Sequence, residues 1–408
     1  MKSGPLIVQF GAGAIGRGFL AYLWTQGGCN VRFVDVDAVM VEALNRRGSY
    51  PIRITGDASP QRWVPRISAV LANDISTITL SLSACEFACT AVGVNSFSAL
   101  APVIAAGIAK RCDSLIEPVS EEERREHWQL HPLNVLCCEN QKGAGSILRE
   151  AVEQHLPDTV HVREFFQNHV AFVDASVGRM VPPPTPELLA EDSLLILAEP
   201  YAELPIDGNA WIGPVPPIPG LLPKTNFAGY VARKLFTHNG GHALLAYEGY
   251  QRGYEFIWQA AEDAELAAEL RGYWNEVGAA LIRAYGFPPD EQRRHEADLL
   301  QRFRNRALGD TVSRVGRDVA RKVRPDDRLV GAALLCIDQG VEPEFASRAI
   351  AAAYAYDVTD DPTAPLIQQV IRSKGISVAL AEYSQIDVSS PLASRIAAEY
   401  ATMFSARP

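Results

Sequence analysis

The stretch from Asn226 to Tyr250, NFAGYVARKLFTHNGGHALLAYEGY, decides how the second half of this chain folds. Its apolar residues recur at helical spacing, so we read it as one helix with a step of about 100° per residue. A stripe about 80° wide then faces the core, and it carries Val231, Leu235 and Leu245. The glycine pair at 240–241 weakens such a helix and predicts that another backbone or a ligand approaches closely there.

Three polar side chains lie on or beside the same stripe and are therefore expected to point inward: Lys234, Asn239 and His242. A desolvated ammonium favours its neutral form, and a neutral lysine accepts a proton from an alcohol. Asn239 and His242 are three residues apart, so they can contact the same small ligand. The alternative is a lysine whose stem follows apolar surface while its charged head stays in water, and the sequence leaves it open.

Length and composition limit the class of protein. At 408 residues the chain is long for a single core and predicts two domains. Its 48% hydrophobic and 21% charged residues are typical of a soluble globular protein. The net charge of -10 argues against nucleic acid and anionic membranes as partners. No apolar run reaches the roughly 18 residues of a membrane span, and no signal sequence is apparent, so the expected location is the cytoplasm.

The seven cysteines are odd in number and stand mostly in apolar runs, which predicts reduced thiols in the core. Cys137 and Cys138 are adjacent and lack the spacing of metal ligands. We therefore expect no metal site.

A glycine-rich turn follows the first apolar run, Leu6 to Phe10, and leads into apolar residues at helical spacing. A strand, a G-x-G-x-x-G turn and a helix form the context that a dinucleotide-binding fingerprint requires. The glycines permit a tight turn and let the backbone approach a pyrophosphate, whose charge is met by amides at the helix N-terminus. The predicted cofactor-binding residues of this turn are Gly11, Ala12, Gly13, Ala14, Ile15, Gly16 and the cationic Arg17.

A second strand, Val31 to Val34, ends at Asp35, which lies 19 residues beyond Gly16. An acid at this place accepts hydrogen bonds from ribose hydroxyls and repels a 2′-phosphate. The expected cofactor is therefore NAD rather than NADP. The alternative is a purely structural turn, with the nearby Asp37 serving only as a helix cap.

Leu133 to Cys138 is typical of a further strand, and Glu139 and Asn140 follow it. Ligands in open α/β sheets bind beyond the carboxyl ends of the strands, so Asn140 is placed to reach the nicotinamide side of a cofactor. An asparagine directly after a strand is also a common turn former, and its position alone does not separate the two interpretations.

The segment 204–223 is rich in proline and glycine and is interpreted as a connection between domains. Beyond it the pattern is helical to the end of the chain. We therefore predict an α/β N-terminal domain with a Rossmann-type doubly wound sheet, residues 1–203, and a mostly α-helical C-terminal domain, residues 204–408. The expected site lies in the cleft between them.

The spacing K-x4-N-x2-H, formed by Lys234, Asn239 and His242, resembles the active-site pattern of the polyol-specific long-chain dehydrogenases. The resemblance covers nearly the whole chain, through the segments FGAGAIGRGF, VDVD, CCEN, FVDASVGRMVPP, RKLFTHNGGHALLAY and RVGRDVARKV. It implies a Rossmann domain joined to a helical domain, NAD as acceptor and no metal. It also implies a small-molecule polyol or polyol phosphate as substrate, and a monomer or homodimer.

The family pattern further implies roles for single residues. Lys234 would be the general base that takes the hydroxyl proton while the hydride passes to the nicotinamide. Asn239 and Asn140 would donate hydrogen bonds to the reacting oxygen. His242 would orient this hydroxyl or a neighbouring one.

In the family, a late arginine and a lysine eight residues further on contact the substrate, and Arg314 and Lys322 have that spacing here. Without the family, Arg314, Arg317, Arg321 and Lys322 form a basic face suited to an anion. The alternative is a solvated helix face.

Two residues depart from the family pattern. The family usually has an aspartate directly before the arginine of the segment SVGRM, where this chain has Gly178. The substrate or a cation thereby loses a carboxylate partner, unless Asp174 replaces it. Ala14 stands where the nearest relatives usually have asparagine, and we expect little effect on binding.

The expected activity is NAD-dependent oxidation of a sugar-alcohol phosphate. The alternatives within the family are a free-polyol dehydrogenase and a hexuronate reductase. From another class, the chain is interpretable as a non-catalytic NAD(H)-binding sensor. A 3-hydroxyacid dehydrogenase, which has a similar two-domain plan, is disfavoured by the sequence around the lysine.

Overall fold

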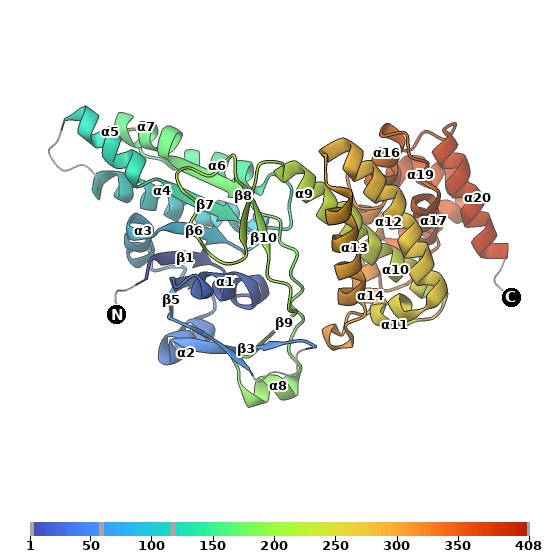
Figure 1. The fold of residues 1–408 in the computed structure, drawn as a ribbon, viewed down its shortest axis with the longest axis horizontal. Helices are drawn as coiled ribbons and strands as arrows, with labels where there is room; N and C mark the ends of the chain where they lie inside the picture. Colours follow the sequence, from blue (N-terminus) through green and yellow to red (C-terminus); the bar gives the residue numbers. More distant parts are fainter. Residues whose placement is uncertain (1–3, 57–60, 115–119, 406–408) are drawn as a thin grey trace. The chain divides into compact units, whose positions relative to one another are not determined.

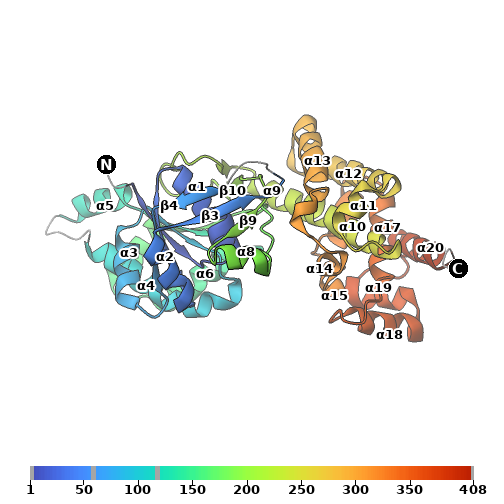
Figure 2. The ribbon, with the colours of Figure 1, turned by 90° about the horizontal axis from the view of Figure 1, so that it is seen from below.

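The computed structural model describes residues 4–56, 61–114 and 120–405. The chain divides into two compact units between Phe227 and Ala228, which we call unit 1 and unit 2. Figure 1 and the turned view in Figure 2 show strands only in the part of the chain coloured blue to green, whereas the yellow to red part is helical. The predicted combination of a doubly wound α/β domain and a helical domain is confirmed.

Unit 1 is built on a 6-stranded sheet with the order β5-β2-β1-β6-β7-β8, in which all neighbours are parallel. Counted along the chain within this sheet, the order is that of a doubly wound dinucleotide-binding fold. The strands are β1 Leu6–Phe10, β2 Asn30–Asp35, β5 Ile67–Leu71, β6 Phe87–Thr90, β7 Leu133–Cys137 and β8 Val170–Asp174.

Alternate residues of β1 enter two different cores, because successive side chains of a strand point to opposite faces of the sheet. Val8 and Phe10 pack with apolar side chains of α3, α4, α6 and α7, while Ile7 packs with those of α1 and α2. The helices of unit 1 are η1 Gly16–Leu20, α1 Ala21–Gln26, α2 Ala38–Arg47, α3 Ile75–Ala84, η2 Val94–Ser96, α4 Phe97–Ser114, α5 Glu121–Leu130, α6 Ala144–Glu153, α7 Val160–His169 and α8 Pro186–Glu191.

Two smaller sheets complete unit 1. One has the order β4-β3-β9, with β3 Ser49–Ile54, β4 Arg62–Pro65 and β9 Ile196–Ala198. The other pairs β10 Leu204–Asp207 with β11 Leu221–Lys224 in parallel.

The predicted domain boundary after residue 203 is wrong, because 204–223 is not a linker. Leu204 and Ile206 of β10 and Leu221 of β11 are buried in the same core as α1, and Ile206 bridges to Ala175, which directly follows β8. Prolines and glycines therefore mark turns inside unit 1. Burial of β10 and β11 moves the division to Phe227–Ala228.

The core of unit 2 is built around α10, whose side chains Leu244, Leu245 and Tyr247 are fully buried. The described part of unit 2 has no strand pairing beyond one bridge between Phe256 and Thr311. Its helical segments, with α9 starting at the last residue of unit 1, are α9 Phe227–Arg233, η3 Lys234–Asn239, α10 Gly240–Gln251, α11 Ile257–Glu262, α12 Ala264–Tyr285, α13 Pro289–Phe303, η4 Arg306–Leu308, α14 Val312–Gly316, α15 Val319–Lys322, α16 Val330–Asp338, α17 Glu344–Tyr354, α18 Ala364–Lys374, α19 Ile376–Ser384 and α20 Pro391–Ser405.

Among the residues that the structure describes, no helix combines the length and the apolar character that crossing a bilayer demands. All seven cysteines are buried and none is in a disulfide, which confirms the prediction of reduced core thiols.

Candidate active site

The three glycines of the turn after β1 serve three different purposes. Gly11 has φ +91°, and a Cβ there would lie 2.5 Å from the carbonyl oxygen of Ala91. A Cβ on Gly16 would lie 2.0 Å from the carbonyl oxygen of Gly11, so only glycine lets the helix start so close to the strand. A Cβ on Gly13 would meet nothing within 4 Å. The open space beside Gly13 fits the close approach of a pyrophosphate to backbone.

Asp35 lies against this turn, at the carboxyl end of β2. Its Oδ2 accepts a hydrogen bond from the Ala12 amide at 2.6 Å, and its Oδ1 accepts one from the Asp37 amide at 3.0 Å. Asp37 caps α2 by accepting from the amides of Val39 and Met40. Asp35 and the glycine turn are thus in contact, as the dinucleotide-binding fingerprint requires. Asp37 caps a helix, which is the role that the alternative interpretation of the sequence gave it.

Arg17 supports the turn from inside the protein. Its guanidinium is buried, and it donates to the carbonyl oxygens of Ala12 at 2.7 Å and Leu194 at 2.9 Å. The Tyr50 hydroxyl donates to the Arg17 carbonyl at 2.7 Å. Burial lowers the pKa of this guanidinium. We therefore revise the prediction of a cation that meets the pyrophosphate: Arg17 fixes the shape of the turn.

Glu139, which sequence reasoning passed over, shapes the next part of the same sheet edge. This buried carboxylate accepts from the amides of Val92 at 3.1 Å and Gly93 at 2.7 Å, in the loop after β6. Asn140 follows it and is exposed beyond the carboxyl end of β7. Because parallel strands end at one edge, the glycine turn, Asp35, this loop and Asn140 share that edge.

The stretch Asn226 to Tyr250 is not a continuous α-helix, which corrects the helical projection made from the sequence. A π-helical turn, η3, separates α9 from α10 and extends from Lys234 to Asn239. At about 100° per residue these two side chains would lie about 140° apart. The i→i+5 bonding of a π-helix brings residues five apart nearly one turn above each other. The turn therefore draws Lys234 and Asn239 toward the same side.

Two side chains of α12 bond to carbonyl oxygens of the π-helical turn. The Tyr273 hydroxyl donates to Phe236 at 2.8 Å, and the Trp274 indole donates to Thr237 at 2.9 Å. A Cβ at Gly240 would lie 2.1 Å from the Tyr273 oxygen, and one at Gly241 would lie 2.8 Å from the Trp274 nitrogen. The glycine pair is closely approached, but by side chains of α12, whereas the sequence predicted another backbone or a ligand.

Lys234, at the start of the π-helical turn, is partly buried. Its pKa is lowered to about 8, chiefly by desolvation and then by the cationic Arg328, while Asp327 acts in the opposite direction. Arg328 and Asp327 form an ion pair of 2.7 Å. An amine with such a pKa exchanges protons near neutral pH, which suits a general base.

His242 lies in the first turn of α10, with its ring stacked on Phe303 at 4.9 Å between centroids and 12° between planes. Its Nε2 lies 3.3 Å from Oδ2 of the buried Asp310. The same carboxylate is paired with Arg314 through Oδ1. Two residues predicted separately, His242 and Arg314, thus meet at one carboxylate that sequence reasoning missed. The i,i+4 spacing of Asp310 and Arg314 is the sequence feature that points to this pair.

Lys322 is in a different neighbourhood from Arg314. It is buried, with 4% of its surface exposed, and its ammonium donates to the carbonyl of Arg317. Its pKa is lowered to about 7, chiefly by burial and then by the cationic Arg328. Lys322 and Lys234 therefore both have Arg328 as their main cationic neighbour. Arg314 and Lys322, which were predicted as a pair, therefore have different neighbours. Arg314 shares the Asp310 carboxylate with His242, and Lys322 shares the neighbour Arg328 with Lys234.

Comparison with known proteins identifies the family. The model described as the mannitol dehydrogenase Rossmann domain matches residues 5–220, and the one described as the mannitol dehydrogenase C-terminal domain matches residues 226–404. The chain belongs to the mannitol dehydrogenase family.

Relatives within this family extend over almost the whole chain. A mannitol-1-phosphate 5-dehydrogenase of Brevibacillus brevis is 35% identical over 389 residues, which cover 95% of either chain. A protein of the same name from Geobacillus thermodenitrificans is 35% identical over 399 residues, covering 97% of this chain and 98% of its own.

Solved structures agree with the mannitol dehydrogenase fold. The ternary complex of Pseudomonas fluorescens mannitol 2-dehydrogenase with NAD and D-mannitol is 18% identical, has a TM-score of 0.71 and covers 99% of this chain and 92% of its own. A substrate-free D-sorbitol dehydrogenase is 18% identical, with a TM-score of 0.68, and covers 92% of this chain and 95% of its own.

Gly178, where this member departs from the family pattern, lies beside an aromatic ring. A Cβ at this position would be 3.3 Å from Cε1 of Tyr201. Asp174, the expected substitute, accepts a hydrogen bond of 2.7 Å from the amide of Gly145. Its pKa is raised by burial. Asp174 therefore connects the end of β8 to the start of α6 through this hydrogen bond.

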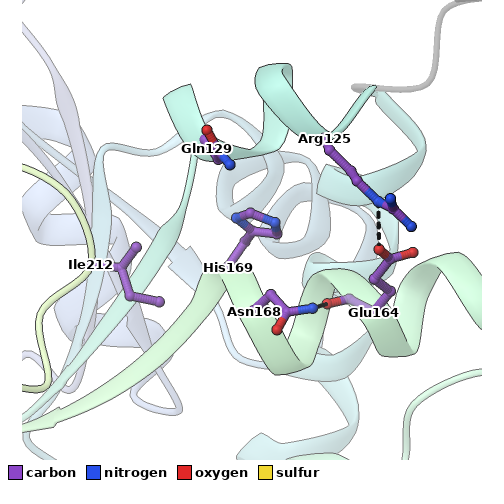
Figure 3. Close-up of a pocket in the computed structure, with 6 residues that line it drawn as sticks. All are labelled: Arg125, Gln129, Glu164, Asn168, His169 and Ile212. Atoms are coloured by element: carbon purple, nitrogen blue, oxygen red, sulfur yellow. Dashed lines mark hydrogen bonds and ion pairs between the residues drawn. The ribbon is translucent and has the colours of Figure 1, made fainter. Parts of the chain in front are cut away.

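Unit 1 has a surface pocket of ≈ 430 Å³ (Figure 3). His169, on its wall, directly precedes β8, so the pocket lies at the amino end of that strand, opposite the glycine turn. Arg125, its cation, pairs with Glu164 at 2.8 Å. The pocket is lined by Arg125, Gln129, Glu164, Asn168, His169 and Ile212.

Three side chains with metal-binding atoms gather at the end of α4: Cys112, Asp113 and His161. Their ligand atoms lie within 4.8 Å of one another. The set offers one ligand fewer than a tetrahedral structural zinc site requires, and it was not foreseen from the sequence.

Proposed function

We propose that this chain oxidises D-mannitol 1-phosphate to D-fructose 6-phosphate with NAD, reversibly. The observation that carries the proposal is the 35% identity to mannitol-1-phosphate 5-dehydrogenases over 95% or more of the chain. The partly buried Lys234, whose pKa lies near 8, supports it with a plausible base. In this proposal the protein acts on a small molecule as a monomer or homodimer.

The proposed cofactor site is the sheet edge of unit 1. The open space beside Gly13 suits a pyrophosphate, and the Asp35 carboxylate is placed at the turn to accept ribose hydroxyls. Its negative charge favours NAD over NADP. NAD supplies a hydride acceptor when it is bound.

The proposed chemistry at the alcohol assigns one task to each residue. Lys234 takes the hydroxyl proton as the carbon gives up its hydride to the bound NAD, so a hydride, which carries two electrons, and one proton leave the substrate. Asn239 and Asn140 donate hydrogen bonds to the oxygen as negative charge develops on it. His242 orients that hydroxyl or its neighbour.

Phosphate recognition is assigned to Lys322, with Arg314 as a further contact to substrate. Lys322 and Arg328 bring positive charge close to Lys234, and burial strengthens their attraction for a dianion. A phosphate at Lys322 would restore the charge on its ammonium, whose pKa is lowered to about 7 in the structure described here.

The direct test measures absorbance of the reduced nicotinamide with NAD and a panel of polyols and their phosphates. We expect turnover with mannitol 1-phosphate, and loss of turnover with retained NAD binding in Lys234→Ala. Turnover of free polyols or hexuronates alone would assign the chain to a sister activity. NAD binding without turnover of any substrate in the wild type would indicate a sensor.

A second test separates phosphate binding from general charge. Lys322→Met should raise KM for the phosphorylated substrate by about 100-fold, the equivalent of a charge-assisted contact of about 3 kcal/mol, and leave a free polyol little affected. Arg324→Met is the matched control, because Arg324 is exposed and pairs with Asp326 at 3.2 Å. Equal losses for both substrates would remove the phosphate assignment.

A further inference from the structure

The last turn of α4 and the first turn of α7 bring a thiol, a carboxylate and an imidazole together. These groups belong to Cys112, Asp113 and His161, and their ligand atoms all lie within 4.8 Å of one another. Cys112 is fully buried, whereas the side chains of Asp113 and His161 are 59% and 37% exposed. The group is therefore closed on the side of the sulfur and open to water on the side of the other two ligands.

The spacing of these atoms fits a tetrahedral zinc ion. Nε2 of His161 lies 3.4 Å from Oδ1 of Asp113. Nitrogen and oxygen ligands lie about 2.0–2.2 Å from zinc, which at tetrahedral angles places two of them about 3.3–3.5 Å apart. The Cys112 sulfur lies 3.7 Å from the carbonyl oxygen of His161, so it packs against the same helical turn. Two ligands thus already have the separation that the ion requires, and the third adjoins them.

The mixture of donor atoms favours zinc over the common hard cations. Zinc accepts sulfur, nitrogen and oxygen ligands, whereas Mg²⁺ and Ca²⁺ prefer oxygen alone. The pKa of the Cys112 thiol is raised to about 12, chiefly by burial and then by Asp113, while Arg124 acts in the opposite direction. The thiol therefore keeps its proton until a cation takes the carboxylate, and binding releases that proton to water.

We propose that Cys112, Asp113 and His161 bind a zinc ion, with water as the fourth ligand. Three protein ligands and a water form an open zinc site. The ion joins the end of α4 to the start of α7 and so stabilises unit 1. Because β6 and β7 are parallel, the chain returns through α4 toward the amino ends of the strands, on the side opposite the glycine turn. The site is therefore independent of the proposed alcohol oxidation.

Zinc content is measured on the full chain after stripping with EDTA and dialysis against Zn²⁺ in excess Mg²⁺. We expect the wild type to lose one equivalent of bound zinc in Cys112→Ser and in His161→Gln. His127→Gln is the matched control, because His127 and His131 form another pair of imidazole rings in unit 1, 4.9 Å apart. Equal zinc content in the wild type and the two ligand variants, or a loss only in His127→Gln, would mean an adventitious ion only and overturn the proposal.

Cobalt substitution tests the sulfur ligand without relying on stability. Co²⁺ should give the wild type a sulfur-to-cobalt charge-transfer band, and Cys112→Ser should lack it although the other six cysteines remain. An unchanged Kd for NAD shows that unit 1 of this variant is folded. Saturating Zn²⁺ should raise the midpoint temperature of unit 1 by about 5 °C in the wild type but not in His161→Gln. A wild type without the band, or with the band retained in Cys112→Ser, would exclude the site whether or not any polyol is oxidised.

Discussion

At the scale of the residue, the balance of charge around Lys234 decides whether it can act as a base. Desolvation and Arg328 favour the neutral amine, and Asp327 favours the ammonium. Arg328 also lowers the pKa of Lys322, so one guanidinium influences both lysines. This arrangement leaves Lys234 partly neutral near pH 8, which is the condition for proton abstraction in the oxidation direction.

Replacing Arg328 by methionine should therefore move the pH profile. Below its pKa Lys234 is an ammonium, so kcat/KM for oxidation should fall about tenfold per pH unit on the acid side. The wild-type midpoint is expected near pH 8. Without Arg328, Asp327 is left to stabilise the ammonium, and the midpoint should rise. Arg324→Met, in which an exposed cation is lost, should keep the wild-type midpoint. An equal or lower midpoint in Arg328→Met would show that Lys234 is not the titrating base.

At the scale of the element, each unit has a π-helical turn that starts at a candidate site residue. In unit 1, η1 starts at Gly16, and in unit 2, η3 starts at Lys234. A π-helical turn inserts a residue into the helical ladder and redirects side chains or carbonyls, and such turns are frequent at functional sites. In η3, donors from α12 bond to carbonyls of the turn.

The glycine turn allows a matched pair of substitutions. In Gly13→Ala the new methyl group enters open space, so the melting temperature should hold while the Kd for NAD rises about tenfold or more. In Gly16→Ala the methyl group would lie 2.0 Å from the Gly11 carbonyl, so unit 1 itself should be destabilised. Calorimetry and fluorescence titration with NAD measure the two effects. Equal NAD affinity in Gly13→Ala and wild type would exclude this turn as the pyrophosphate site.

Tyr273→Phe tests how η3 is held. The variant loses the hydroxyl group that lies 2.8 Å from the Phe236 carbonyl oxygen and 3.3 Å from that of Arg328. We expect a loss of about 1–3 kcal/mol in the free energy of unfolding, the usual cost of leaving buried acceptors without a donor. Tyr254→Phe is the control, because its partner Asp263 pairs with Arg252. Chemical denaturation compares them, and equal losses would mean that η3 needs no support from α12.

At the scale of the whole molecule, the two units have separate hydrophobic cores. The cores of unit 1 lie on the two faces of its sheet, and that of unit 2 surrounds α10. The proposed cofactor residues Gly11 to Gly16 and Asp35 are all in unit 1, whereas Lys234 and His242 are in unit 2.

Scanning calorimetry should therefore resolve two unfolding transitions. Addition of NAD should raise the midpoint temperature of the transition that belongs to unit 1. At about 100 times its Kd, a ligand that binds only the folded state stabilises it by about 2.7 kcal/mol. Gly16→Ala should lower the NAD-sensitive transition and Gly240→Ala the other, since the methyl group at 240 would collide with Tyr273. One transition that all three changes move together would mean that the units unfold as one.

The sequence by itself determined the fold class, the glycine turn with Asp35 and the helical character of unit 2, because hydrophobic periodicity and glycine spacing are local. The family was indicated by the resemblance of the K-x4-N-x2-H spacing and its neighbouring segments to a known pattern. The sequence did not determine the domain boundary, since prolines inside buried strands look like those of a linker. Both β10 and β11 are assigned to unit 1 only by the core they enter.

Only the tertiary structure decided which groups surround the candidate residues. Arg17 points inward, η3 interrupts the helix, and Asp310, Asp327 and Arg328 become neighbours of His242 and the two lysines. The physical reason is that burial and pairing depend on segments distant along the chain. A residue pattern can identify a lysine, but its pKa is set by the charges and the packing that folding brings to it.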